Sequence, residues 1–206
     1  MPRLDNFDRA RPRRAGQRGF TMTEMMLVSA ITFIIAAFSI EVYIQIARNM
    51  KTSGDGRDLG SEVALAKMRG PAYFTQARVY ADLSAQSFHV EVWLKSSSQW
   101  STEGGIQHLS QGVTFGYGSL SSPPSGTQAS LAQAPACLNS GGGAIANTAC
   151  IVFNSRGIPI DSTGTPTNND AFYITDGQQT YGVTVSATGL IQSWQTVAST
   201  ANWRKR

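Results

Sequence analysis

The arrangement of apolar and polar residues divides the chain into one long helical segment and a following region of short strands. Apolar residues dominate from Phe20 to Ile46, and the stretch between Met25 and Ile40 holds no charge, no proline and no glycine. A helix over residues 20–46 would be about 40 Å long at 1.5 Å per residue, which is enough to cross the hydrocarbon core of a bilayer. The pattern therefore predicts a transmembrane helix.

Helical spacing continues over residues 47–70, which we expect to form a helical neck. Three apolar residues recur on one face of it and should pack against the rest of the protein: Leu59, Val63 and Ala66. Glycines between residues 54 and 60 disfavour the helix by about 1 kcal/mol each relative to alanine and predict a loosened or bent helix near Thr52–Gly56. The Gly70-Pro71 pair predicts the helix end, because a residue that precedes proline disfavours helical geometry.

From residue 71 the hydrophobic pattern changes to the period of two that is typical of half-buried strands. In Ser87–Lys95 four apolar residues alternate with His89, Glu91, Trp93 and Lys95, and Arg78–Leu83 is the expected hairpin partner. Further strands are predicted at Val113–Tyr117, Cys150–Asn154, Ala171–Thr175, Tyr181–Ser186 and Leu190–Thr196. Residues 119–149, rich in Gly, Ser, Pro and Ala, are expected to form a surface loop. The fold class is thus α+β, with a long helix packed on an antiparallel β-sandwich-like head over residues 71–206.

The charges of the chain are distributed unevenly. Residues 1–19 contain six arginines and two aspartates, whereas the remaining residues carry equal numbers of basic and acidic side chains. A nucleic-acid-binding body would have a basic surplus of its own, which this one lacks. A basic segment directly before an apolar helix instead predicts a cytoplasmic N-terminus, with everything after the helix on the other side of the membrane.

Glu24 is an acidic residue inside the apolar segment. A carboxylate deep in hydrocarbon costs about 2.5–3.5 kcal/mol on insertion scales. Either Glu24 lies near the lipid headgroups, helped by the positive end of the helix, or it meets a partner cation. Cleavage of the chain just before Phe20 would create such a cation, a new α-amino group.

The residues around this position resemble the processing site of type IV prepilins. The resemblance rests on the basic leader, the Gly-Phe junction within QRGFTMTE (residues 17–24), the acid at the fifth position after it and the uninterrupted apolar helix. It implies a cleaved leader over residues 1–19, cut by a prepilin peptidase after Gly19, and N-methylation of Phe20. It also implies that Glu24 pairs with the terminal amine of a neighbouring subunit during filament assembly, where an unpaired charge would be costly.

Two departures and one alternative accompany this resemblance. The leader is long for prepilins with an N-terminal phenylalanine. The proline that many relatives carry near the twenty-second mature residue is absent, and this chain has Glu41 and Val42 there. The alternative is a secretory signal peptide cut beyond the apolar region, for which Ala36, Ala37 and Ala47 are weak candidate sites. That alternative does not explain Glu24.

Three segments of the head resemble the H-type minor pseudopilins and the FimT-type minor pilins (GspH/FimT). They are Leu109–Val113, Ile151–Gly157 and Tyr181–Gly189, in the order expected for that family. The resemblance implies a structural subunit, not an enzyme, near the tip of a type II secretion pseudopilus or a type IV pilus, where it assists assembly and protein secretion. Its partners would be other pilin or pseudopilin subunits, the prepilin peptidase and lipid of the bacterial inner membrane, with the head in the periplasm.

The alternative function within the same family is a DNA-binding minor pilin of a competence pilus. Its candidate contacts are four C-terminal residues: Trp203, Arg204, Lys205 and Arg206. Some FimT-type relatives bind DNA through basic residues near the terminal strand turn, but the corresponding residues here, Gly189–Gln192, include no arginine. We therefore expect a solvated tail and no nucleic-acid partner.

The remaining candidate chemistry is sparse. Cys137 and Cys150 are the only cysteines; in an oxidising periplasm they are expected to form a structural disulfide, and two free buried thiols are the alternative. His89, on the polar side of its strand, is expected to be solvated. The segment Asp161–Asp170 offers oxygen ligands without the spacing of an EF-hand, so we expect a polar loop. No catalytic motif is present, and no metal or cofactor is expected.

Overall fold

The computed structural model describes residues 19–167, 169–200 and 202–206. The chain divides into two units, Met1–Ile44 and Gln45–Arg206, which are described separately. The first unit holds the beginning of a long helix, and the second holds the rest of this helix and all the strands. Of the expected leader, residues 1–18 lie outside the described residues.

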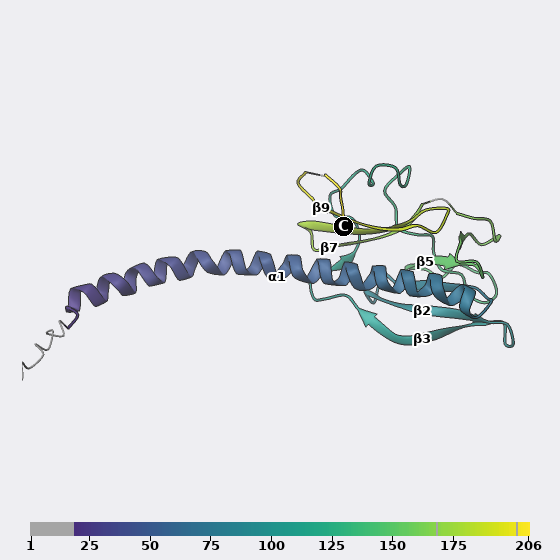
Figure 1. Ribbon diagram of the computed structural model, residues 1–206, viewed down its shortest axis with the longest axis horizontal. Coiled ribbons are helices and arrows are strands. Elements are labelled where there is room, and N and C mark those ends of the chain that lie inside the picture. Colours follow the sequence, from purple (N-terminus) through teal and green to yellow (C-terminus); the bar gives the residue numbers. More distant parts are fainter. Residues whose placement is uncertain (1–18, 168, 201) are drawn as a thin grey trace, which may run out of the picture. The chain divides into compact units, whose positions relative to one another are not determined.

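Residues Met22–Ala72 form one α-helix, α1 (Figure 1). In the first unit its apolar side chains are exposed. The hydroxyls of Ser29, Thr32 and Ser39 donate to helix carbonyls four residues earlier, at 2.7, 2.7 and 2.8 Å. These polar side chains therefore satisfy themselves within the helix, and the helix is long and apolar enough to cross a membrane.

In the second unit, α1 is continuous through residues 45–72, so the prediction of a loosened helix at Thr52–Gly56 is wrong. The reason is packing. Gly56 is buried, and a Cβ atom built on it would lie only 2.3 Å from Cδ1 of Tyr181. At Gly70 a Cβ atom would lie 2.5 Å from the carbonyl oxygen of Asn154. Both glycines thus let the helix backbone approach the sheets closely, and tertiary contacts override their low helix propensity.

The end of α1 lies two residues beyond the predicted Gly70. The amide of Thr75 donates to the carbonyl of Gly70 at 3.0 Å, and the amide of Phe74 donates to that of Pro71 at 3.2 Å. This is the pairing of a Schellman motif, whose left-handed position is filled here by Phe74 at φ 50°. Pro71 is tolerated in the last turn of the helix.

The strands form two antiparallel sheets of five strands each (Figure 1). The first sheet has the order β3-β2-β1-β5-β6. Its strands are β1 (Ala77–Asp82), β2 (Ser87–Leu94), β3 (Gln99–His108), β5 (Thr148–Phe153) and β6 (Pro159–Ile160). The second has the order β10-β9-β8-β7-β4. Its strands are β4 (Thr114–Phe115), β7 (Asp170–Thr175), β8 (Gln179–Val185), β9 (Ile191–Val197) and β10 (Arg204–Lys205).

The predicted β1–β2 hairpin and the two-sheet head are confirmed, with Asp82 paired to Ser87 at the turn. Strands β3, β6 and β10 were not predicted. The longest of these, β3, contains the Gly104-Gly105 pair at an irregularity in its pairing with β2, which obscures the alternating pattern. Of the expected strand Val113–Tyr117, only β4 (Thr114–Phe115) forms, because glycines with positive φ lie on both sides of these two residues: Gly112, Gly116 and Gly118.

The core lies where α1 meets the inner faces of both sheets. From α1 it includes the three predicted residues Leu59, Val63 and Ala66, all fully buried, so the predicted packing face is confirmed. The two sheets contribute Val79, Phe88, Val90, Ile151, Phe153, Phe172, Ile174, Val183 and Val185 among others. The loop 119–149 is less superficial than expected, because Leu120, Ala134 and Cys137 are buried.

Candidate functional site

The first turn of α1 forms a reciprocal cap. The amide of Glu24 donates to Oγ1 of Thr21 at 3.2 Å, while Oε2 of Glu24 accepts from both the amide and the hydroxyl of Thr21 at 2.9 Å. This is a capping box, in which the side chains at the N-cap and the third helical position satisfy each other's backbone donors. Glu24 therefore already has hydrogen-bond partners within its own chain.

The residues of the predicted cleavage site precede this cap. Gly19 and Phe20 lie outside the helix and are exposed, Phe20 with 79% of its surface accessible. The carboxylate of Glu24 is thereby held at the beginning of α1, one residue from the backbone amide of Phe20. The Thr-x-x-Glu spacing is a sequence signal for a helix start, so residues 21–24 alone were sufficient to predict this cap.

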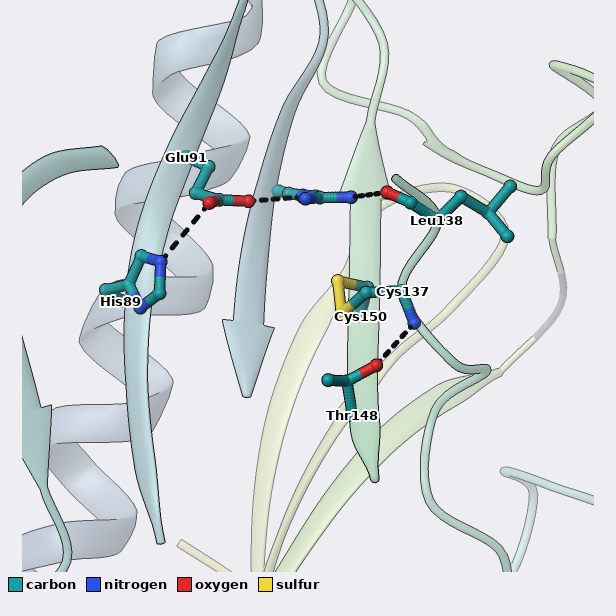
Figure 2. Close-up of polar contacts among 7 residues, drawn as sticks. His89, Glu91, Cys137, Leu138, Thr148 and Cys150 are labelled. Atoms are coloured by element: carbon teal, nitrogen blue, oxygen red, sulfur yellow. Dashed lines mark hydrogen bonds and ion pairs between the residues drawn. A yellow bond between two sulfur atoms is a disulfide. The ribbon is translucent and has the colours of Figure 1, made fainter. Parts of the chain in front are cut away.

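A second polar cluster lies on the outer face of the first sheet. Nε of Arg78 donates to Oε2 of Glu91 at 2.6 Å, and Nη1 of Arg78 donates to the carbonyl oxygen of Leu138 at 2.6 Å. Nε2 of His89 lies 3.4 Å from Oε1 of Glu91 (Figure 2). The expectation that His89 is solvated is wrong: it is 8% exposed, and the ring of Tyr80 on β1 stacks on it.

The ion pair between Arg78 and Glu91 is largely removed from water. The Arg78 side chain is 3% exposed and that of Glu91 13%. The guanidinium also lies 4.0 Å from the ring centroid of Trp100. Burial lowers the pKa of Arg78. Burial would raise the pKa of Glu91, but hydrogen bonds and charge from His89 and Arg78 outweigh it and leave that pKa below its usual value.

Cys137 and Cys150 form a disulfide, as predicted (Figure 2). Cys150 lies on β5, and Cys137 lies in the long loop before it. Thr148 supports the same junction, because its hydroxyl accepts from the amide of Cys137 at 3.0 Å and donates to the carbonyl of Ile145 at 2.7 Å. The disulfide thus attaches the loop to the outer face of the sheet, next to the Leu138 carbonyl that binds Arg78.

The C-terminal residues are not a solvated tail. Arg204 and Lys205 form β10 and pair with Gln195 and Trp194 of β9. The indole of Trp203 donates to the carbonyl of Ser122 at 2.9 Å, and its ring lies 5.7 Å from that of Tyr173. The charged side chains of the segment remain exposed.

The Asp161–Asp170 segment is a polar loop in the part that the structure describes. Oδ1 of Asp161 accepts from the amides of Thr163 and Thr165, and Oδ2 of Asp170 accepts from Thr167. Asn168 is outside the described residues. In the rest of the described chain, no group of three or more His, Cys, Asp or Glu side chains has the arrangement of a metal site.

Comparisons with known proteins agree with the N-terminal features. Residues 14–40 match the family model of the prokaryotic N-terminal methylation motif. No curated protein sequence matches the chain significantly. Two solved structures of the minor pseudopilin EpsH from the type II secretion system of Vibrio cholerae are similar. One has a TM-score of 0.45 and 10% identity over 69% of this chain and 95% of EpsH. The other has a TM-score of 0.43 and 11% identity over 71% and 94%.

The matched motif contains the three residues that the sequence singled out, Gly19, Phe20 and Glu24. They lie directly before and within the first turn of a helix whose exposed apolar side chains suit a lipid environment. The chain therefore carries the prokaryotic N-terminal methylation motif at the start of a long apolar helix.

Proposed function

We propose that this protein is a minor pseudopilin or minor pilin, cleaved between Gly19 and Phe20 and N-methylated on Phe20. It then enters a type II secretion pseudopilus or a type IV pilus near the tip. The observation that carries the proposal is the methylation motif over residues 14–40, with Glu24 at the fifth position after the Gly-Phe junction. An exposed junction just outside α1 supports it, because a peptidase needs an accessible, non-helical bond.

The topology proposed for the subunit follows from its charges. The arginine-rich leader stays in the cytoplasm, residues 20–46 span the inner membrane, and the head is in the periplasm. The Cys137–Cys150 disulfide supports an oxidising compartment for the head.

The role proposed for Glu24 is to change partners during assembly. In the single subunit the carboxylate accepts hydrogen bonds from Thr21. Cleavage gives the Phe20 nitrogen a positive charge, and in the filament Glu24 of one subunit pairs with this ammonium on its neighbour. In a low dielectric each ion that lacks a partner is costly, and pairing the carboxylate with the ammonium offsets that cost.

The test separates the capping function of Glu24 from its charge. Glu24→Gln keeps a side chain that can complete the capping box but removes the charge. Thr21→Ala removes part of the cap and keeps the charge. Mass spectrometry of the mature N-terminus reports processing, and sheared-filament yield or secretion from the native bacterium reports incorporation.

We expect wild-type protein to begin at N-methylated Phe20. Both variants should be cleaved like wild type, Glu24→Gln should lower incorporation at least tenfold, and Thr21→Ala should reduce it far less. A mature chain that still begins at Met1, where the prepilin peptidase is active, would contradict the processing. Normal incorporation of Glu24→Gln would contradict the charge pairing.

A further inference from the structure

A groove of about 520 Å³, which we call the outer groove, crosses the outer face of the first sheet. Residues from all five strands line it, in the spatial order of the sheet: Trp100, Trp93, Arg78, Val152 and Ile160. In the strand register Trp93 lies opposite Trp100. Val152 lies opposite Arg78 on one side and opposite Ile160 on the other. Every lining residue belongs to the second unit.

Two tryptophans form one end of the outer groove. The ring centroids of Trp93 and Trp100 are 5.2 Å apart, and the rings are inclined by 70°. The guanidinium of Arg78 covers the Trp100 ring, 4.0 Å from its centroid. The half-buried Trp93 lines the outer groove and also a neighbouring hollow of about 440 Å³, whose lining includes Tyr73 and four residues with hydroxyls: Thr75, Ser96, Ser101 and Thr102. Trp93 is therefore a platform for a flat apolar surface of a ligand.

The rim of the outer groove offers polar atoms that no other described residue uses. Asp161 and Asp170 each accept from threonines of their own loop through one carboxylate oxygen, Oδ1 and Oδ2 respectively. Asn139 accepts from two glycine amides through Oδ1. Within the part of the chain that the structure describes, the second oxygen of both carboxylates and Nδ2 of Asn139 have no protein partner. The rim thus presents both acceptors and donors to a ligand.

One wall of the outer groove is held in place before any ligand binds. It consists of residues around Cys137, whose disulfide to Cys150 attaches them to β5 (Figure 2). The carbonyl of Leu138 accepts from Nη1 of Arg78 at 2.6 Å, and the carbonyl of Pro135 accepts from the amide of Cys150 at 2.8 Å. Because a covalent bond and two hydrogen bonds fix this wall, binding requires little further ordering of it.

The charge of the outer groove disfavours an anion. Arg78 is the one cation among the lining residues that the structure describes, and Glu91 neutralises it at 2.6 Å. Burial raises the pKa of Asp170, the hydrogen bond from Thr167 lowers it, and the charge of Asp161 raises it further. The two aspartates therefore act on the same region and leave it negative. A phosphate group, a nucleic acid or an acidic polysaccharide would be repelled there.

We propose that the outer groove binds a neutral oligosaccharide. A pyranose ring has an apolar face of C–H groups, which packs on an aromatic ring, and an edge of hydroxyls, each with one donor and two acceptor positions. Trp93 matches the face, and the carboxylates and amides of the rim match the edge. The volume lies within the range of about 300–1,000 Å³ that is usual for ligand sites. The hollow that shares Trp93 can take a further sugar of the same chain.

A proline-rich peptide would also pack on a tryptophan, but the rim does not suit it. Proline has no N–H group, so such a peptide cannot donate to the carboxylate oxygens of Asp161 and Asp170. Those oxygens would lose water without gaining a donor, which is unfavourable. A sugar carries a hydroxyl donor on most of its ring carbons. The inference is independent of the proposed pilin function, because neither leader cleavage nor assembly involves these residues.

The test uses the full chain in nanodiscs of phosphatidylcholine, since maltoside detergents would themselves present sugars to the groove. Isothermal titration calorimetry, with tryptophan fluorescence as a second readout, measures the binding of three neutral tetrasaccharides: cellotetraose, chitotetraose and maltotetraose. We expect at least one of them to bind saturably, with an affinity that does not change with salt because the ligand is uncharged.

Variants separate the ring platform from the polar rim. Trp93→Ala should weaken binding about tenfold or more, and Trp93→Phe, which keeps an aromatic ring, should recover part of the loss. Asp161→Asn with Asp170→Asn should weaken it several-fold, because hydrogen bonds to charged acceptors are the stronger ones. Asp58→Asn, which removes an exposed carboxylate of α1 outside the lining, is the matched control and should bind like wild type.

Three results would overturn the proposal. They are no saturable binding of any tetrasaccharide up to 10 mM, equal affinity of wild type, Trp93→Ala and the double aspartate variant, or binding of decaproline in place of the tetrasaccharides. The last result would indicate a peptide groove. Leader cleavage and filament incorporation are measured separately, so failure of the sugar site is distinguishable from failure of the proposed pilin function.

Discussion

Gly56 of α1 offers a direct test of how closely the helix approaches the second sheet. In Gly56→Ala the new Cβ atom would lie 2.3 Å, 2.4 Å and 2.7 Å from three carbons of the Tyr181 ring. Carbon atoms in contact are normally 3.5–4.0 Å apart, so either the helix or the ring must move by about 1 Å or more. Tyr181 is 3% exposed and has core residues around it, which leaves the ring little room.

The magnitude follows from two opposing effects. Overpacking of a core costs about 1–3 kcal/mol, and the severity of this overlap places Gly56→Ala at the upper end. Replacing a glycine inside a helix by alanine stabilises the helix by about 1 kcal/mol. We therefore expect Gly56→Ala to lower the free energy of unfolding by about 2 kcal/mol.

Gly54→Ala is the matched control, because a Cβ atom at Gly54 meets nothing within 4 Å. This variant should gain up to about 1 kcal/mol, so the two variants should differ by about 3 kcal/mol. In a chain of this size such a difference corresponds to about 6–12 °C in Tm. Thermal unfolding of both full-length variants in detergent, followed by tryptophan fluorescence, measures it. If both substitutions raise Tm equally, the close packing of Gly56 on Tyr181 is refuted.

Three further predictions concern the head. Glu91→Gln leaves the buried Arg78 without its charged partner and should cost about 3 kcal/mol; denaturant unfolding of this variant measures the loss. Because the pKa of Glu91 is lowered in the folded state, wild-type stability should fall as pH drops below about 4.5, and Glu91→Gln should show a weaker slope there; an unchanged slope would argue against the pair. Replacing Cys137 and Cys150 by serine should cost about 3 kcal/mol, and a reductant should destabilise wild type but not this double variant.

Local patterns in the sequence were sufficient for much of the fold. The apolar run, the neck face with Leu59 and Val63, and the β1–β2 hairpin each depend on residues close together in the chain, and all three are confirmed. The disulfide between Cys137 and Cys150 could be predicted because they are the two cysteines of the chain and the head is expected in an oxidising compartment. The Thr21-x-x-Glu24 cap was equally local and could have been predicted.

The features that could not be predicted depend on contacts between distant segments. The alternating pattern places His89 on the polar face of its strand. The burial of that face depends on which distant segments cover the sheet, and the pattern does not show this. Gly56 has a low helix propensity by itself, and only the position of Tyr181 explains why no larger residue fits there. Arg206 joins Arg57 in one groove because β10 pairs with β9, and a two-residue strand gives no periodic signal.

The capping box has a consequence for the energetics of filament growth. Since Glu24 already accepts two hydrogen bonds from Thr21, the pairing proposed above with a neighbour's terminal amine would replace one set of hydrogen-bond donors by another and would not supply a partner to an unpaired carboxylate. The gain from this side chain would then be the difference between an ion pair and two hydrogen bonds, which is smaller than the gain from pairing an ion that has no partner.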